Sequence, residues 1–101
     1  MQIDIIENDG VWTATLIGRL DTVASEQCAA DFRQLSEHAA ESIILDCEQL
    51  EYISSSGLRL FLSLGKDTRT AGGHLTVRHP NEETKKVFKL TGFYKLLNIE
   101  D

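Results

Sequence analysis

Residues 42–66 read "SIILDCEQLEYISSSGLRLFLSLGK", and this stretch decides the fold class. The run "SIILDC" (42–47) is continuously apolar and too short for a helix, which is typical of a central strand covered on both faces. Apolar residues then recur at helical spacing from Leu58 to Gly65. They predict an amphipathic helix from Ser56 to about Ala71, ended by the glycines at 72 and 73. A buried strand that leads directly into a helix indicates an α/β sheet.

The remaining segments extend this pattern in both directions. "QIDIIE" and "VWTATLIG" are alternating β-rich runs joined by "NDG", which predicts a hairpin, and apolar steps of three and four predict a helix from Thr22 to about Glu41. "HLTVRH" predicts a strand, "PNEETKKVFKLTG" a helix that opens with proline and acids, and "FYKLLNIE" a short apolar tail. The order β-β-α-β-α-β-α predicts a mixed sheet that begins with a hairpin and is parallel in part.

Composition limits the class of protein. The 101 residues, 42% of them hydrophobic, suit a single domain over 1–101, and the formal charge of −6 argues against nucleic acid or an anionic membrane as a partner. The acidic N-terminus is unlike a secretory signal, and no apolar stretch approaches the roughly 18 residues of a membrane span, so we expect a cytoplasmic protein. Cys28 and Cys47 lack the spacing of a metal or disulfide site, and we expect both to be small core residues.

The serine triplet Ser54–Ser56, followed by Gly57, stands at the predicted strand-to-helix turn. One hydroxyl, expected to be that of Ser55 or Ser56, would cap the helix and contribute about 1 kcal/mol. The others are either small polar residues that allow the turn, or part of a site where free N–H groups and the helix dipole favour a phosphate. Asp21 closes the other strand-to-helix connection. If the strand before Asp21 runs parallel to "SIILDC", the Asp21 carboxylate reaches the same sheet edge as the serine triplet. Taken alone, Asp21 is a helix cap.

Three stretches together resemble the STAS domain of bacterial anti-sigma factor antagonists: "LIGRLD" (16–21), "IILDCEQLEYISSSGLRLFLSL" (43–64) and "GGHLTVRHPNEETKKVFKLTGFYKLL" (72–97). The resemblance implies a mixed sheet with helices packed mainly on one side. It also implies that a cognate kinase, itself an anti-sigma factor, phosphorylates the serine two residues before the glycine. That serine is Ser55, with Ser54 before it and Ser56 after it. The family often has Asp where this chain has Ser54, although Ser also occurs there.

Two functions follow from this resemblance. In the first, the domain captures an anti-sigma factor of the switch-kinase type when Ser55 is unphosphorylated, and a phosphatase would be a further partner. Asp21, Ser54, Ser56 and Gly57 would then support the docking face, together with the helix that follows them. In the second, the domain is a structural STAS subunit of a transport or lipid-trafficking complex and is never modified.

An enzyme that uses Ser55 as its nucleophile is a third hypothesis. It requires a general base, and the candidates are His38, His74 and His79. None belongs to a catalytic motif, and we expect each to be a solvated surface or strand-end residue. A GxSxG elbow, a glycine-rich phosphate loop and a metal-ligand cluster are all missing from the sequence. We therefore expect no enzymatic activity, no cofactor and no metal.

Overall fold

The computed structural model of the protein describes residues 1–95 and 97–101. Its strands are β1 (Gln2–Asn8), β2 (Val11–Leu20), β3 (Ser42–Asp46), β4 (Leu50–Ile53), β5 (His74–Arg78) and β6 (Asn98–Glu100). Its helices are α1 (Thr22–Ser36), α2 (Ser55–Ala71) and α3 (Glu82–Thr91), and a short 3₁₀ helix, η1 (Phe93–Lys95), follows them. The predicted hairpin, helices and strands are all present, whereas β4 and β6 were not predicted.

The chain begins with a regular antiparallel hairpin. Asp9 and Gly10 take φ values of 50° and 78° in the turn, as the "NDG" sequence predicts. The pairing of β1 with β2 then runs without interruption from Asn8 opposite Val11 to Gln2 opposite Ile17. Strand β2 continues beyond the hairpin toward α1, and this extra length provides a second pairing edge.

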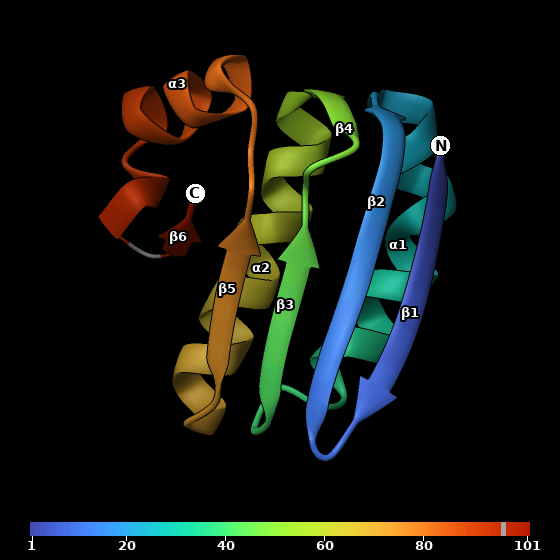
Figure 1. The fold of residues 1–101 in the computed structure, drawn as a ribbon, viewed down its shortest axis with the longest axis vertical. Helices are drawn as coiled ribbons and strands as arrows, with labels where there is room; N and C mark the ends of the chain where they lie inside the picture. The colour runs from blue at the N-terminus through green and yellow to red at the C-terminus, as the bar shows by residue number, and fades with distance from the viewer. Residues whose placement is uncertain (96) are drawn as a thin grey trace.

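The sheet is mixed, in the order β1-β2-β3-β5-β6. Strands β3 and β5 run parallel to β2, and β6 runs parallel to β5 (Figure 1). Strand β4 pairs, also in parallel, with the last residues of β2, from Gly18 opposite Leu50 to Leu20 opposite Ile53. Strand β2 therefore has β3 beside its first half and β4 beside its end. Strands β2 and β4, which end side by side, lead into α1 and α2 at the same edge of the sheet.

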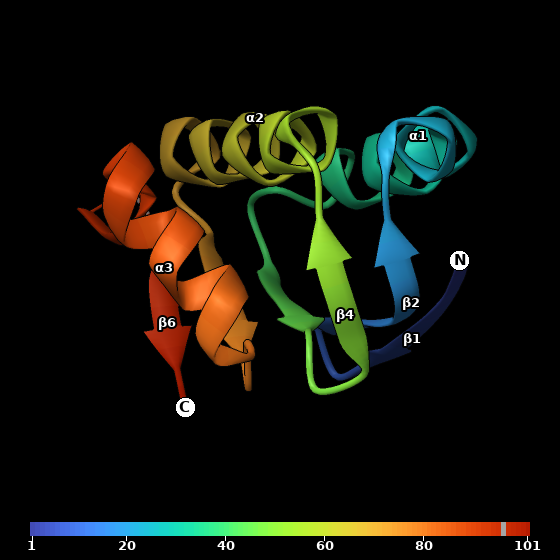
Figure 2. The same cartoon turned by 90° about the horizontal axis from the view of Figure 1, so that it is seen from above.

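Helices α1 and α2 cover one face of the sheet, as Figure 2 shows, and α3 lies beyond the carboxyl ends of β5 and β6 (Figure 1). The core between the layers contains three rings in sequence, with Phe32 5.8 Å from Phe61 and Phe61 6.0 Å from Phe88 between centroids. In β3, Ile43 and Leu45 are buried beneath the helices, but Ile44 is only half-buried. Strand β3 is central, as predicted, but the expectation that it is covered on both faces was wrong.

The helix boundaries differ from the prediction mainly at α1. Its helical pattern was expected to reach about Glu41, but the helix ends at Ser36 and turns occupy 37–40. Helices α2 and α3 end at Gly72 and Gly92, whose φ values of 83° and 80° are left-handed. The predicted apolar tail becomes η1 and β6, and Leu96 within it lies outside the described residues.

Candidate functional site

Two strand-to-helix connections meet at one edge of the sheet. Leu20, the last residue of β2, lies opposite Ile53, the last residue of β4, and the backbone N–H of Ser54 donates to the Leu20 carbonyl at 2.9 Å. Asp21 and Ser55 therefore begin their helices side by side. Strand β2 runs parallel to β3, as the prediction of a shared edge required, and β4 brings the two loops together by pairing with the end of β2 (Figure 1).

Asp21 is the N-cap of α1. Its side chain is exposed, and Oδ1 accepts a hydrogen bond of 2.8 Å from the backbone N–H of Ala24. The Asp21 carbonyl also accepts from both the backbone N–H and the hydroxyl of Ser25, at 2.9 and 2.7 Å. These bonds hold the Asp21 loop in place beside the start of α2, with one carboxylate oxygen committed to the cap.

Ser54, and not Ser55 or Ser56, caps α2. Its φ and ψ of −85° and 172° are those of an N-cap, and its Oγ accepts from the backbone N–H of Gly57 at 3.2 Å. Ser54 is 8% exposed, so its hydroxyl serves the helix and not the surface. The expectation that Ser55 or Ser56 is the cap was wrong, because the bond from Ser54 to Leu20 places the extended residue one position earlier.

Ser55 is the first residue of α2, and its side chain is exposed, while Ser56 is half-buried. The first turn of α2 carries no acidic residue, and its cap is a neutral hydroxyl. The dipole and the first N–H groups of α2 therefore give this end of the helix a positive character that no acidic residue of α2 itself offsets. A negatively charged group on the Ser55 hydroxyl would be electrostatically favoured there.

Gly57 allows α2 to approach the sheet at this edge. A Cβ atom at position 57 would lie 2.8 Å from Cγ and Cδ2 of Leu20 and 3.0 Å from Cγ1 of Ile53. Carbon atoms in contact prefer about 3.5–4.0 Å, so only glycine permits the observed separation. Gly57 thereby fixes the distance between the start of α2 and the ends of β2 and β4.

A family model described as "STAS domain" matches residues 2–101. The chain belongs to the STAS domain family. The protein BtrV of Bordetella bronchiseptica is 28% identical over 99 residues, which make up 98% of this chain and 85% of that protein. The anti-sigma F factor antagonist of Paenibacillus polymyxa is 26% identical over 102 residues, which cover 100% of this chain and 87% of the relative.

Solved structures of the anti-sigma factor antagonist SpoIIAA share the fold. The unphosphorylated form matches with a TM-score of 0.77 at 24% identity, covering 99% of this chain and 88% of SpoIIAA. The phosphorylated form, described as a Bacillus cell fate determinant, matches with a TM-score of 0.76 at 24% identity, covering 99% and 92%. The mixed sheet with its helices on one face is thus the STAS fold.

The sequence analysis missed one feature of this edge of the STAS domain. The guanidinium carbon of Arg19, on β2, lies 4.4 Å from the centroid of the Tyr52 ring, on β4. This cation–π pair depends on the pairing of β2 with β4, and no pattern in the sequence predicts it. Val23, in the first turn of α1, is 63% exposed, so an aliphatic side chain is open to solvent near Asp21 at this edge.

The three histidines occupy different parts of the STAS domain. His38 lies in the turn after α1, where its ring stacks on Trp12 with a centroid separation of 3.9 Å, and Nδ1 is 2.8 Å from Oε2 of Glu41. Its side chain is 34% exposed, so His38 is a surface residue, as expected, but one whose ring packs on Trp12 and is only partly solvated. His74 begins β5, at the end of the sheet opposite to Ser55, and the exposed His79 follows β5. No contact of the described residues pairs a histidine with Ser55.

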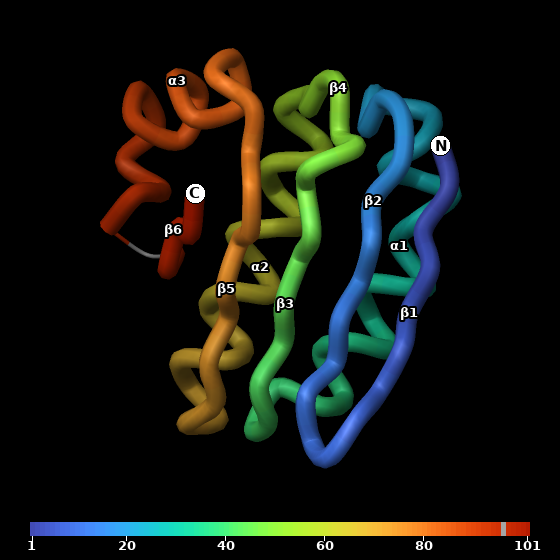
Figure 3. Tube along the Cα trace, in the orientation of Figure 1, coloured from blue at the N-terminus to red at the C-terminus, as the bar shows by residue number. Residues whose placement is uncertain are grey.

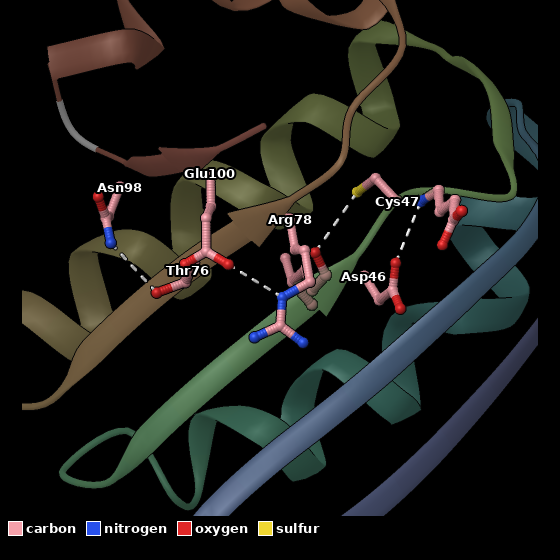
Figure 4. A network of polar contacts seen from close by, with 8 residues as sticks. Asp46, Cys47, Thr76, Arg78, Asn98 and Glu100 are labelled. Carbon is pink, nitrogen blue, oxygen red and sulfur yellow. Dashed lines mark hydrogen bonds and ion pairs between the residues drawn. The ribbon is translucent and has the colours of Figure 1, made fainter.

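A network of polar contacts joins the ends of β3, β5 and β6 (Figure 4), with Cys47 buried in the core and Arg78 half-buried at the end of β5. Arg78 Nε donates to Glu100 Oε1 at 3.2 Å across β5 and β6, and the Cys47 N–H donates to the Arg78 carbonyl at 2.8 Å. Burial, and then the charge of Asp46, raise the pKa of the Cys47 thiol to about 12. Cys28 and Cys47 are both buried, as predicted, and Cys47 is an inert thiol at neutral pH.

None of the helices over residues 1–95 and 97–101 combines the length and the apolar character of a membrane-spanning segment.

Proposed function

We propose that this STAS domain is an anti-sigma factor antagonist whose binding to its partner is switched by phosphorylation of Ser55. Unphosphorylated, it captures an anti-sigma factor that is also a serine kinase, and the capture releases the kinase's other partner. The domain acts by binding and does not itself catalyse a reaction. A phosphatase that regenerates the free hydroxyl would complete the cycle.

The single observation that carries the proposal is that the helix cap and the exposed hydroxyl belong to two different serines, Ser54 and Ser55. Ser54 caps α2 and is buried, so the exposed Ser55 hydroxyl has no structural duty that modification would destroy. The first turn of α2 itself contains no acidic residue, so the helix dipole and its first N–H groups favour a phosphate there, while the Asp21 carboxylate in the adjacent loop is already engaged by the N–H of Ala24. Asp21 lies in the neighbouring loop, and Ser56 and Gly57 set the position of the turn.

The same geometry supports an electrostatic switch. A phosphoserine adds about −1.5 to −2 charges and three strong acceptor oxygens. A poorly paired charge in a desolvated interface costs about 2–5 kcal/mol, which corresponds to a loss of affinity of roughly 30-fold to several-thousand-fold. The fold is expected to persist, because the charge sits at the favourable end of a helix dipole.

The test is affinity capture from the native cell with wild type, Ser55→Ala, Ser55→Asp and a control, Gln34→Glu. The control adds one negative charge at an exposed position on α1, away from Ser55. We expect Ser55→Ala and Gln34→Glu to retain a kinase-type partner, Ser55→Asp to lose it, and all variants to melt at nearly the same temperature. Retention of the partner by Ser55→Asp would instead favour the unmodified structural subunit.

A further inference from the structure

Strand β1 forms one edge of the sheet (Figures 1 and 3). Within the part of the chain that the structure describes, it pairs with β2 alone, and that pairing extends over seven residues without a register shift. The other edge strand, β6, has only three residues. The outer side of β1 therefore offers a long, regular row of backbone donors and acceptors for another strand.

Strand β1 has little of the usual protection against such pairing. Proteins blunt an exposed edge with charged side chains, proline, a bulge or a very short strand. The sequence "QIDIIEN" has no proline or lysine and extends over seven residues, and its charged side chains are those of Asp4 and Glu7. Ile6 is 62% exposed, which leaves a large aliphatic side chain uncovered on the strand.

We propose that β1 pairs antiparallel with β1 of a second copy of the chain. A two-fold axis through Ile5 places all seven residues of β1 in pairs. Ile5 then faces Ile5 of the second copy, and Asp4 faces Ile6. The remaining pairs are Ile3 with Glu7 and Gln2 with Asn8.

This register is the one that the charges favour. No acid faces an acid when the axis passes through Ile5. Moving the axis to Asp4 places two aspartates directly opposite one another, and like charges in that position are destabilising. Moving it to Ile6 leaves only the pairs that involve residues 4–8, with fewer backbone bonds.

The pairing leaves the Ser55 site free in both copies. Ile3 and Ile5 pack on the core side of β1, and Asp4 and Ile6 alternate onto the face that the helices leave open. A two-fold axis perpendicular to the sheet keeps the helices of both copies on one side. Because β1 pairs antiparallel with its copy, the two Ser55 edges point to opposite ends of a continuous sheet. The dimer would present two partner sites at once.

The test is sedimentation velocity over a wide range of protein concentrations with a charge-swapped pair of variants. Ile6→Lys places a lysine opposite Asp4 twice in each dimer, and Ile6→Asp places an acid there. We expect the wild type to dimerise. Each dimer contains two of these cross-strand pairs, so the Ile6→Lys dimer should be roughly 2- to 30-fold tighter than the wild-type dimer, and the Ile6→Asp dimer weaker by a similar factor.

Leu90→Lys and Leu90→Asp are the matched controls, since Leu90 is 87% exposed on α3 and the changes in net charge are identical. Amide hydrogen exchange in concentrated wild type supplies a second readout, because the outward N–H groups of β1 become protected only when they are paired. A monomer at every concentration would overturn the proposal. So would a dimer in which the Ile6 pair of variants differs no more than the Leu90 pair.

Discussion

Gly57→Ala tests how closely α2 must approach the sheet for the site to form. The added methyl group would lie 2.8 Å from two atoms of Leu20 and 3.0 Å from Ile53, about 0.5–0.7 Å inside the lower limit of carbon–carbon contact. Leu20 is fully buried and Ile53 nearly so, which leaves neither side chain room to withdraw. Overpacking of this kind costs about 1–3 kcal/mol, and replacing glycine by alanine in a helix returns up to about 1 kcal/mol.

We therefore expect a net destabilisation of about 1–2 kcal/mol, or a fall in Tm of roughly 4–16 °C for a domain of this size. Urea and thermal denaturation give these values, and amide shifts of Leu20 and Asp21 report the displacement of α2. Gly65→Ala is the control in the same helix, because its methyl group would lie 3.1 Å from the end of the Leu97 side chain and at an ordinary 3.7 Å from that of Leu75. A Gly57→Ala protein as stable as Gly65→Ala would refute this account of the packing.

Three further changes probe the rest of the framework. Ser54→Ala should cost about 1 kcal/mol in urea denaturation by removing the cap on the Gly57 N–H, and Ser54→Asp should restore most of it. Gly73→Ala should prevent stable folding, measured by circular dichroism, because its Cβ would clash with the backbone carbonyl oxygens of Ala39 and Glu41. The raised pKa of Cys47, about 12, means that the unfolded chain loses this proton first, so stability should fall as the pH rises from about 9 toward 12. Cys47→Ala should make that decline shallower, and a thiol reagent should modify Cys47 only after unfolding.

The sequence predicted the elements whose signals are local. The hairpin turn follows from "NDG", and Gly72 and Gly92 end their helices because each takes a left-handed conformation. Strand β4 was missed because its four residues follow no alternating pattern and become a strand only by pairing with the end of β2. The uncovered face of β3 was missed because an apolar run does not reveal what lies over it.

In the candidate site, too, only the features with a local sequence signal could be predicted. The position of Ser55 on an exposed turn was predictable, because a strand-to-helix connection lies at a sheet edge. The choice of Ser54 as cap was not, since three adjacent serines are chemically alike and backbone geometry alone separates them. The stacking of His38 on Trp12 joins residues far apart in the chain, so helical periodicity could assign His38 only to a polar face.

Phosphorylation of the purified domain by its captured kinase tests the central claim most directly. Wild type, Ser55→Ala and Ser56→Ala are incubated with the kinase and ATP, and the phosphate is counted and located by mass spectrometry. We expect one phosphate on Ser55 in the wild type and in Ser56→Ala, none in Ser55→Ala, and loss of kinase binding by the phosphorylated protein. A phosphate on Ser54 or Ser56, or undiminished modification of Ser55→Ala, would contradict the account.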